Sequence, residues 1–292
     1  MPGKSRIKKP RLEPKPDFET GLNYWADIPA DNNGVLGGFG NGTLPRVDAL
    51  SSRMFILSLV PRLALVPSSL KTLPTNSPST SSIRTRALDV GAGIGRVTGS
   101  VLIHLLDTVE ILEPAPHFLD QAVVDSAKWK GLGGVEVDKK MPKKAARFWR
   151  GGLAGFDPAS PAASADELTR KGFWDDEQNE RPEGLKYDVI WCQWCLGHLS
   201  TEDLIVFFKA AKAALLPKET YAVIVVKENI CPDLEEDGMK GSTVFDDEDS
   251  SLTRSDKAWR YAFAQAGLEL VRMEVQQGFP DELFPVHMYA LR

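Results

Sequence analysis

Three glycines and one acid carry the clearest chemical signal in the sequence. Gly91, Gly93 and Gly95 lie in ALDVGAGIGR, between an apolar segment typical of a buried strand and a run typical of a helix. A glycine turn in this place lets a ligand approach the backbone, with the unpaired amides of the helix start pointing at it. Glu113 ends the next strand-like segment, 22 positions after Gly91. An acid at about that spacing can accept both hydroxyls of a ribose.

The residues around this loop separate two kinds of cofactor. A nicotinamide enzyme normally carries a third, close-packing glycine after the turn, but Arg96 stands there instead. Asp89, which precedes the glycines, is an acid typical of loops that approach a cationic cofactor without phosphate. A glycine turn that binds no ligand is the simpler alternative, and the paired acid Glu113 argues against it.

A second group of residues follows other strand-like segments. Trp194 and His198 come at or just after the end of YDVIWCQW, and Asn229 ends YAVIVVKEN. Because open α/β sheets bind ligands at the carboxyl ends of their parallel strands, we expect these side chains near the glycine loop. Each has a plainer interpretation by itself: a lone histidine is usually structural, tryptophans mostly lie in the core, and the acidic run FDDEDSS is typical of a solvated loop.

The elements that position these residues alternate along the chain. Strands are predicted at residues 87–90, 109–113, 187–194 and 221–229, and helices at 96–106, 201–216 and 255–267. RFWRGGLAGF supplies the one strand expected between residues 125 and 186, and LELVRMEVQ with HMYALR forms a terminal antiparallel pair. This β-α-β order predicts a layered α/β fold with a mostly parallel sheet.

The composition of the chain suggests its division into segments. Residues 1–16 form a basic, proline-rich tail expected to be disordered, and residues 17–60 form an N-terminal cap. A Ser/Thr/Pro-rich connection covers 61–86, and the α/β domain covers 87–292 with a surface insertion at about 157–184.

Charge and cysteine content limit the function classes. The net charge of −5 and the absence of one long basic stripe argue against nucleic acid as a partner. No apolar run is long enough for a membrane span and the start of the chain is too charged for a signal peptide, so no membrane association is expected. Three cysteines are one short of a four-cysteine zinc site, and no metal is predicted. The chain is expected to be a cytoplasmic monomer, and the basic tail leaves the nucleus open as a second location.

The glycine loop with its ribose acid resembles the class I S-adenosylmethionine methyltransferases. Further segments narrow the resemblance to the eukaryotic protein N-terminal Xaa-Pro-Lys methyltransferases, the α-N-terminal family: YWADIP, LGGFGN, SSR, LDVGAGIGR, WCQWCLGHL, VVKEN, FDDEDSS and DELFPVHMYALR. They run in order from about Leu22 to Arg292, leaving out roughly 61–86 and 125–184. The resemblance implies a Rossmann-like, mostly parallel seven-stranded sheet with an antiparallel last strand, helices on both faces and an N-terminal helical cap.

The resemblance also implies an activity, a cofactor and a set of site residues. The activity is methyl transfer from S-adenosylmethionine to the α-amino group of proteins that begin Xaa-Pro-Lys, with N-terminal tails, ribosomal proteins among the candidates, as partners. The residues implied for the cofactor are Gly91, Gly93, Arg96, Glu113, Leu153 and Gln193. Those implied for the peptide are Trp25, Trp194, Asp246, Asp247, Ser251 and Phe284. The catalytic residues implied are Asp249, named first for proton removal, His198, named second, and Asn229.

The chain departs from the family pattern at three positions. Family members usually carry a tyrosine where Phe284 aligns, which puts a hydroxyl contact to the peptide in doubt. Glu113 stands where aspartate is common, and Ala154 where a polar side chain often sits. Two alternatives remain open at this stage: a methyltransferase for a small amine, which would not need Trp194 together with the acidic cluster, and a protein that binds the cofactor without turnover.

Overall fold

The computed structural model describes residues 14–64, 84–132, 144–174 and 184–292. Most of the expected tail, most of the Ser/Thr/Pro-rich connection and part of the expected insertion therefore lie outside the described residues. No helix in the described ranges is long and apolar enough to cross a bilayer.

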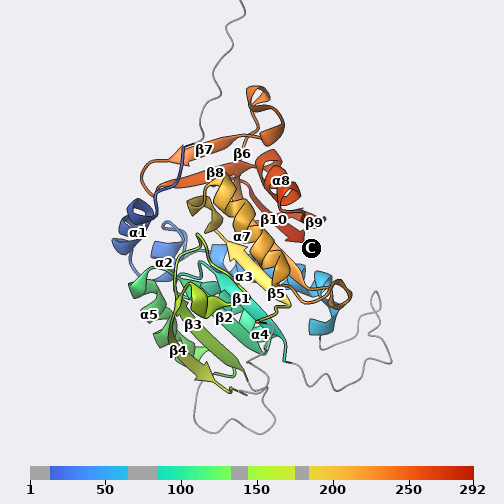
Figure 1. Ribbon diagram of the computed structural model, residues 1–292. Helices are drawn as coiled ribbons and strands as arrows, with labels where there is room; N and C mark the ends of the chain where they lie inside the picture. Colours follow the sequence, from blue (N-terminus) through green and yellow to red (C-terminus); the bar gives the residue numbers. More distant parts are fainter. Residues whose placement is uncertain (1–13, 65–83, 133–143, 175–183) are drawn as a thin grey trace, which may run out of the picture.

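A single twisted sheet forms the centre of the molecule (Figure 1). Its main path runs in the order β4-β3-β2-β1-β5-β6-β10-β9. The strands on this path are β1 (Arg86–Val90), β2 (Thr108–Glu113), β3 (Ala145–Arg150), β4 (Asp166–Gly172), β5 (Val189–Gln193), β6 (Val223–Cys231), β9 (Leu270–Val275) and β10 (Val286–Leu291). Strands β3, β2, β1, β5 and β6 are mutually parallel, and β10 runs antiparallel between β6 and β9. The Rossmann-like fold class and its antiparallel last strand are confirmed.

The seven predicted strands correspond to β3, β2, β1, β5, β6, β10 and β9, and within the described residues three further strands join the same sheet. Strand β4 lies inside the segment predicted to be a surface insertion and pairs antiparallel with β3 at the sheet edge. Strands β7 (Thr243–Asp246) and β8 (Ser251–Ser255) form a hairpin that joins the end of β6. In both cases the added strand pairs with backbone N–H and C=O groups that the sheet leaves free. Such pairing does not require the added strand to be apolar. Strand β1 begins at Arg86, one residue before the strand predicted at 87–90.

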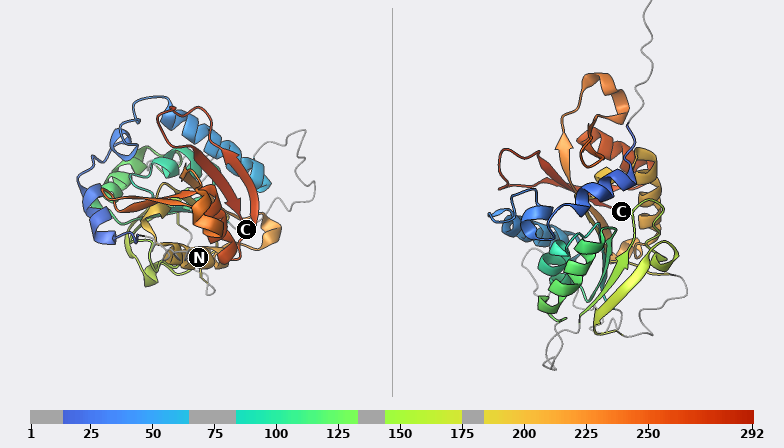
Figure 2. Two further views of the ribbon diagram at one scale, coloured as in Figure 1. Left: turned by 90° about the horizontal axis from the view of Figure 1, so that it is seen from above. Right: turned by 90° about the vertical axis from the view of Figure 1, so that its left-hand side faces the viewer.

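Helices cover both faces of the sheet, as expected. On one face α7 (Thr201–Ala213) and α8 (Asp256–Gln265) pack against side chains such as Leu88, Ile190 and Ile224. On the other face α3 (Leu44–Leu59), the π-helical turn η2 (Thr98–Leu102) with α4 (Ile103–Leu105), and α5 (Pro116–Asp125) pack against the alternate strand residues. Figure 2 shows the two helical layers with the sheet between them. The centre of the sheet is thereby buried on both sides, which is why its strands read as continuous apolar runs.

Two further helices complete the N-terminal cap, α1 (Phe18–Ala26) and α2 (Asn32–Val35). They lie at the same end of the molecule as the β7–β8 hairpin (Figure 1). The backbone amide of Asp17, which caps α1, donates to Ser250 Oγ in the hairpin turn at 2.8 Å. Cap and hairpin therefore meet over the carboxyl ends of the parallel strands.

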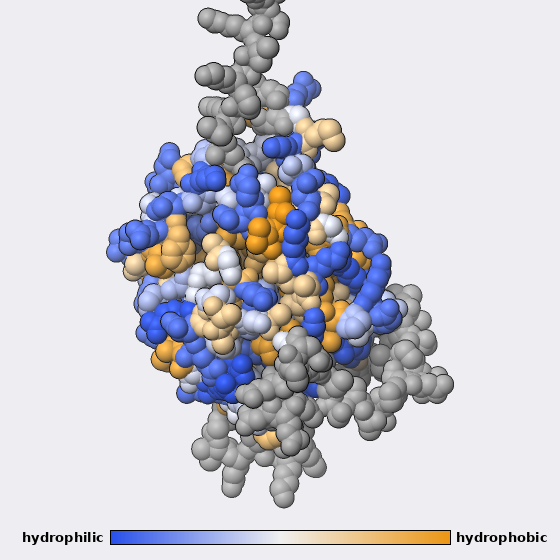
Figure 3. Space-filling view, viewed as in Figure 1, coloured by the Kyte–Doolittle hydropathy of each residue, from blue (hydrophilic) through white to orange (hydrophobic). Residues whose placement is uncertain are grey.

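The surface seen in the same orientation is mixed in character. Hydrophilic side chains are interspersed among apolar ones across the centre of this face (Figure 3). The large apolar side chains that are exposed are spread over many elements, from Leu50 and Met54 on α3 to Val206 on α7. Scattered apolar residues of this kind are normal for a protein surface.

Candidate active site

The glycine loop leaves β1 in a conformation that only glycine adopts easily. Gly91, Gly93 and Gly95 have φ of 60°, 56° and 74°. A Cβ on Gly91 would lie 2.3 Å from Cys195 Cβ, whereas a Cβ on Gly93 would meet nothing closer than Val35 at 3.9 Å. Gly91 is thus required by packing, and Gly93 faces open space in a pocket.

Glu113 is tied directly to this loop. Its Oε2 accepts from the amide of Gly93 at 2.7 Å, and its Oε1 accepts from the amide of Ala115 at 2.8 Å. Burial raises the pKa of Glu113 to about 7, although both amide hydrogen bonds oppose that rise. Each carboxylate oxygen keeps a further lone pair, so the group can still accept two hydroxyl donors.

All six residues predicted for the cofactor line one pocket at this loop: Gly91, Gly93, Arg96, Glu113, Leu153 and Gln193. Asp89 also lines it; burial raises the pKa of Asp89 to about 6, while its carboxylate accepts from Thr98 Oγ1 at 2.6 Å. A glycine cradle, a ribose-type acid and a guanidinium in one pocket fit a nucleoside cofactor that carries a carboxylate.

A second pocket adjoins the first. Trp25, Val35, Trp194 and His198 line both. Of the residues predicted for the peptide and for catalysis, those that line the second pocket are Trp25, Trp194, His198, Asn229, Asp249 and Ser251. Because the two pockets share these lining residues, a ligand in the first pocket can come into contact with a ligand in the second.

Three predicted residues do not line this pocket. Asp246 ends β7 and Asp247 begins the turn of the β7–β8 hairpin; both are exposed, and Asp246 accepts from the Glu248 amide at 2.9 Å. Phe284 is 48% exposed and lies outside the pocket, while its neighbour Leu283 lines it. Asp246 and Asp247 lie at the rim of the second pocket and not in its wall, because a carboxylate at the rim stays hydrated.

His198 is held from two sides. Its Nε2 accepts from Trp25 Nε1 at 3.1 Å, and its ring makes a hydrogen bond to the backbone of Ser250. Burial lowers the pKa of His198, opposed by the charge of Asp249. The imidazole is therefore neutral at neutral pH with both nitrogens engaged. By contrast, Asp249 Oδ1 is buried and accepts no hydrogen bond from the described residues, so Asp249 carries the free acceptor of the pair.

Trp194 follows β5 in a left-handed conformation, with φ of 54°. Its amide donates to Lys227 O at 3.1 Å, and its ring lies against the Arg96 guanidinium, 5.5 Å from the ring centroid. Phe279 packs against the same ring at 6.2 Å between centroids. A non-glycine residue at positive φ costs free energy and is most often found at functional sites.

Two buried charges that the sequence reasoning missed hold the loop from Trp194 to Leu199. Glu228 Oε1 accepts from the amides of Cys195 and Leu196, each at 3.0 Å, and burial raises the pKa of Glu228 to about 7. Arg254, 1% exposed, donates from Nη1 to Leu196 O at 3.1 Å and from Nη2 to Leu199 O at 2.5 Å. The sequence did contain a signal for Glu228: an acidic residue next to Asn229 in VVKEN, at the end of a predicted central strand.

Comparison with known proteins decides the family. The model of the family described as AdoMet dependent proline di-methyltransferase matches residues 13–292. The chain belongs to this family. It is accordingly an S-adenosylmethionine-dependent methyltransferase, and the cofactor predicted from the glycine loop is confirmed.

Relatives in the family cover nearly the whole chain. An alpha N-terminal protein methyltransferase 1 from Arabidopsis thaliana is 35% identical over 274 residues, covering 94% of this chain and 79% of the relative. The protein of that name from Schizosaccharomyces pombe is 32% identical over 280 residues, covering 96% and 98%. An N-terminal Xaa-Pro-Lys N-methyltransferase from Xenopus laevis is 31% identical over 270 residues, covering 92% of each. The structure of a SAM-dependent methyltransferase from Leishmania major is similar, with a TM-score of 0.63, 29% identity, and coverage of 94% and 82%.

Proposed function

We propose that this chain transfers methyl groups from S-adenosylmethionine to the free α-amino group of proteins that begin Xaa-Pro-Lys once the initiator methionine is removed. The observation that carries the proposal is the shared wall of Trp25, Trp194 and His198 between the two pockets. A methyl donor in the first pocket and an amine in the second would meet at this wall. The family names of the relatives supply the substrate class.

In this proposal the first pocket holds the cofactor through four kinds of contact. The amides around Gly91 and Gly93 receive its methionine part, and the Arg96 guanidinium faces the carboxylate of that part. Glu113 accepts hydrogen bonds from the ribose hydroxyls. The side-chain amide of Gln193 offers a hydrogen bond to a polar group of the cofactor. Leu153, buried in the same wall, packs on the adenine side.

The second pocket would orient the peptide. The ring of Trp194 offers a flat apolar face to the second-position proline, and Asn229 can hold the peptide backbone through a donor and an acceptor. Ser251 adds a hydroxyl in the same wall. Phe284 lies outside the wall of the second pocket and could make only an apolar contact with the peptide at the edge of that pocket.

An acidic rim would receive the third-position lysine. The pKa of Tyr24 in the cap is raised first by burial and then by the negative charges of Asp249, Glu248 and Asp246, so the hairpin turn carries its charge close to α1. With Asp247 beside them, they would attract a cationic N-terminus as well as the lysine ammonium.

The reaction asks little of the protein beyond orientation and proton removal. The α-amine has a pKa of about 8, and its neutral nitrogen attacks the methyl carbon while the carbon–sulfur bond breaks and leaves S-adenosylhomocysteine. The amine must lose a proton to become nucleophilic, and Asp249 Oδ1 is the acceptor best placed to take it. His198, whose Nε2 already accepts from Trp25, would orient the site rather than act first.

The candidate substrates and location follow from the family resemblance. Ribosomal proteins are candidate substrates, and a cytoplasmic enzyme would meet their N-termini as they leave the ribosome. A monomer suffices for this chemistry, since both pockets are built from one chain.

Mass spectrometry of a short peptide that begins Ser-Pro-Lys, incubated with the protein and S-adenosylmethionine, tests the proposal. We expect gains of about 14 mass units per methyl group on the free peptide. The N-acetylated peptide should gain none, and a peptide with alanine at position three should react far more slowly. Cofactor binding without any gain would instead favour a small-amine substrate or a protein without turnover.

A further inference from the structure

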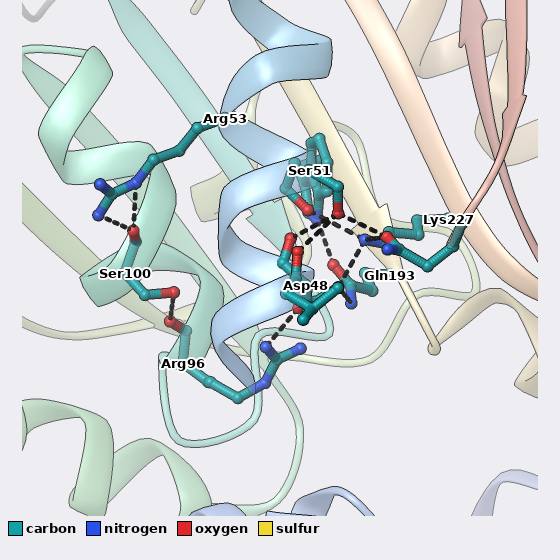
Figure 4. A network of polar contacts seen from close by, with 11 residues as sticks. Asp48, Ser51, Arg53, Arg96, Ser100, Gln193 and Lys227 are labelled. Atoms are coloured by element: carbon teal, nitrogen blue, oxygen red, sulfur yellow. Dashed lines mark hydrogen bonds and ion pairs between the residues drawn. The ribbon is translucent and has the colours of Figure 1, made fainter. Parts of the chain in front are cut away.

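A buried polar network joins the cap helix α3 to the cofactor pocket (Figure 4). At its centre is Asp48, which has no exposed surface. Asp48 Oδ2 lies 2.5 Å from Arg96 Nη1, and Asp48 Oδ1 lies 2.5 Å from Lys227 Nζ and accepts from Gln193 Nε2 at 3.0 Å. One carboxylate thus binds three side chains that come from the glycine loop, β5 and β6.

The electrostatics of this cluster keep the carboxylate ionised. Burial alone would raise the pKa of Asp48, but Arg96 and Lys227 outweigh burial, and the pKa lies below its usual value. Burial lowers the pKa of Lys227, and the charge of Asp48 opposes that shift. A buried acid between two cations is costly to assemble and even more costly to break, so each member is held in one position.

Arg96 depends on Asp48 for its orientation. Within the described residues, Asp48 is the one hydrogen-bonding and ion-pairing partner of the Arg96 guanidinium, whose other contact is the Trp194 ring. A guanidinium has five N–H donors, so most of them remain for a ligand in the pocket that Arg96 lines.

Gln193 is fixed in the same way. Its Oε1 accepts from Trp191 Nε1 at 3.1 Å and its Nε2 donates to Asp48, which together determine the orientation of the amide. Asp48 itself lies behind the pocket lining. Its direct contacts to residues of the pocket lining are those with Arg96 and Gln193.

The network also reaches the peptide side. Lys227 binds Asp48 with its ammonium group while its backbone carbonyl accepts from the Trp194 amide at 3.1 Å. Lys227 Nζ further bonds to Ser52 Oγ and Gln276 Oε1, at 3.1 and 2.6 Å. Trp194, one of the residues in the wall between the pockets, is thus connected through Lys227 to the buried carboxylate on α3.

We propose that Asp48 is a positioning residue for cofactor binding: from the cap helix it fixes Arg96 and Gln193 at the pocket, so that docking of the cap and affinity for the cofactor are coupled. This inference rests on the proposed role of the first pocket in binding S-adenosylmethionine.

The test is isothermal titration of the full chain with S-adenosylmethionine, comparing wild type with Asp48→Asn. The variant keeps the size of the side chain and removes its charge. We expect the Kd to rise on the order of 10-fold, as for the loss of a charge-assisted contact. The KM for S-adenosylmethionine should rise with it, while kcat at saturating cofactor changes little.

A double-mutant cycle separates positioning from general destabilisation. In an Arg96→Gln background, Asp48→Asn should raise the Kd further by no more than about 2-fold, because its main route to the ligand is gone. If Asp48→Asn does not fold, Asp48→Asn/Lys227→Met removes both buried charges together and should show the same rise in Kd.

Glu110→Gln is the matched control. Glu110 is equally buried and accepts from Arg86 and Trp149, each at 2.7 Å, in a second ion-pair cluster on β2 outside the pocket lining. It should lower the melting temperature without changing the Kd. A wild-type Kd in folded Asp48→Asn, or an equal loss in the Arg96→Gln background, would overturn the inference. A wild-type protein that does not bind S-adenosylmethionine would instead overturn the proposed function.

Discussion

The indole Nε1 of Trp25 donates a hydrogen bond to Nε2 of His198 across 3.1 Å, joining α1 of the cap to the loop after β5. The two rings meet edge to face, with 6.3 Å between their centroids. Gly21, on the same helix, lets α1 come so close that an added Cβ would lie 3.2 Å from His198 Nδ1. The cap thus forms part of the wall of the second pocket rather than a separate cover.

Trp25→Phe keeps most of the ring and removes its donor. Losing one partly buried hydrogen bond corresponds to roughly 1 kcal/mol, so we expect the KM for a Ser-Pro-Lys peptide to rise about 5-fold while the Kd for S-adenosylmethionine stays within about 2-fold. Steady-state kinetics and calorimetry measure the two. Trp174→Phe is the control, because Trp174 Nε1 bonds to Lys171 O away from either pocket. An unchanged KM in Trp25→Phe would show that the bond does not shape the peptide site.

Asp249→Asn tests the proton acceptor. If Asp249 removes the α-amine proton, kcat at pH 7 should fall by about 100-fold or more, while cofactor binding is retained. The defect should shrink at about pH 9.5, where the free amine is already neutral. Asp120→Asn, at an exposed position on α5 outside the lining of both pockets, serves as the charge-matched control. A defect in Asp249→Asn that is the same at both pH values would assign Asp249 a binding role instead.

The central strands could be predicted from sequence because they are buried on both faces. ALDV, VEILE and YDVIWCQW are short apolar runs, and the structure places β1, β2 and β5 within one or two residues of them. The helix predicted after the glycine loop is present, but its middle, Thr98–Leu102, is a π-helical turn that contains Gly99. A Cβ on Gly99 would lie 2.5 Å from Trp129 Nε1, a packing constraint that no local pattern reveals.

The missed elements take their structure from partners far away in the sequence. Strand β4 is mostly exposed and lacks apolar alternation, so only its pairing with β3 makes it a strand. Asp48 is a comparable case among single residues. The sequence of a helix does not show whether an acidic residue on it is buried or exposed. The cations that make the burial of Asp48 possible, Arg96 and Lys227, lie 48 and 179 positions later in the chain. The glycine loop and Glu113 were found because their spacing is local.

The affinity for S-adenosylmethionine should depend on pH through Glu113. Burial raises the pKa of Glu113 to about 7, and only the ionised group accepts two hydroxyl donors. The Kd should therefore fall by about 10-fold from pH 6 to pH 8 and change little above that. Glu113→Gln should bind more weakly with a flatter profile, and Asp89 accounts for any pH dependence that remains. Parallel slopes in wild type and Glu113→Gln would mean that Glu113 does not titrate in this range.

Gly91→Ala and Gly37→Ala separate backbone strain from packing. Both glycines have positive φ, 60° and 56°, and pay a similar cost of about 1 kcal/mol for an added Cβ. The Cβ on Gly37 meets nothing within 4 Å, while the Cβ on Gly91 would overlap Cys195. We expect a drop of a few degrees in melting temperature for Gly37→Ala, and a larger drop with loss of cofactor binding for Gly91→Ala. Equal drops would mean that the glycine loop can move aside.

Glu228 should make stability depend on pH in a way that a glutamine cannot. Its pKa is raised from 4.5 to about 7 in the folded chain, so the folded state binds the proton more tightly than the unfolded state does. The stabilisation from this shift is complete below about pH 4.5 and is lost as the pH rises through about 7.

Glu228→Gln keeps an acceptor for the amides of Cys195 and Leu196 but does not titrate. The melting temperature of wild type minus that of the variant should therefore decrease between pH 5 and pH 8, by an amount that corresponds to at most about 3 kcal/mol. Thermal unfolding across this range measures it, with the exposed Glu219→Gln as the control for loss of one negative charge. A difference that stays constant with pH would show that Glu228 holds the Trp194–Leu199 loop as a permanently ionised acid, with Arg254 nearby compensating its charge.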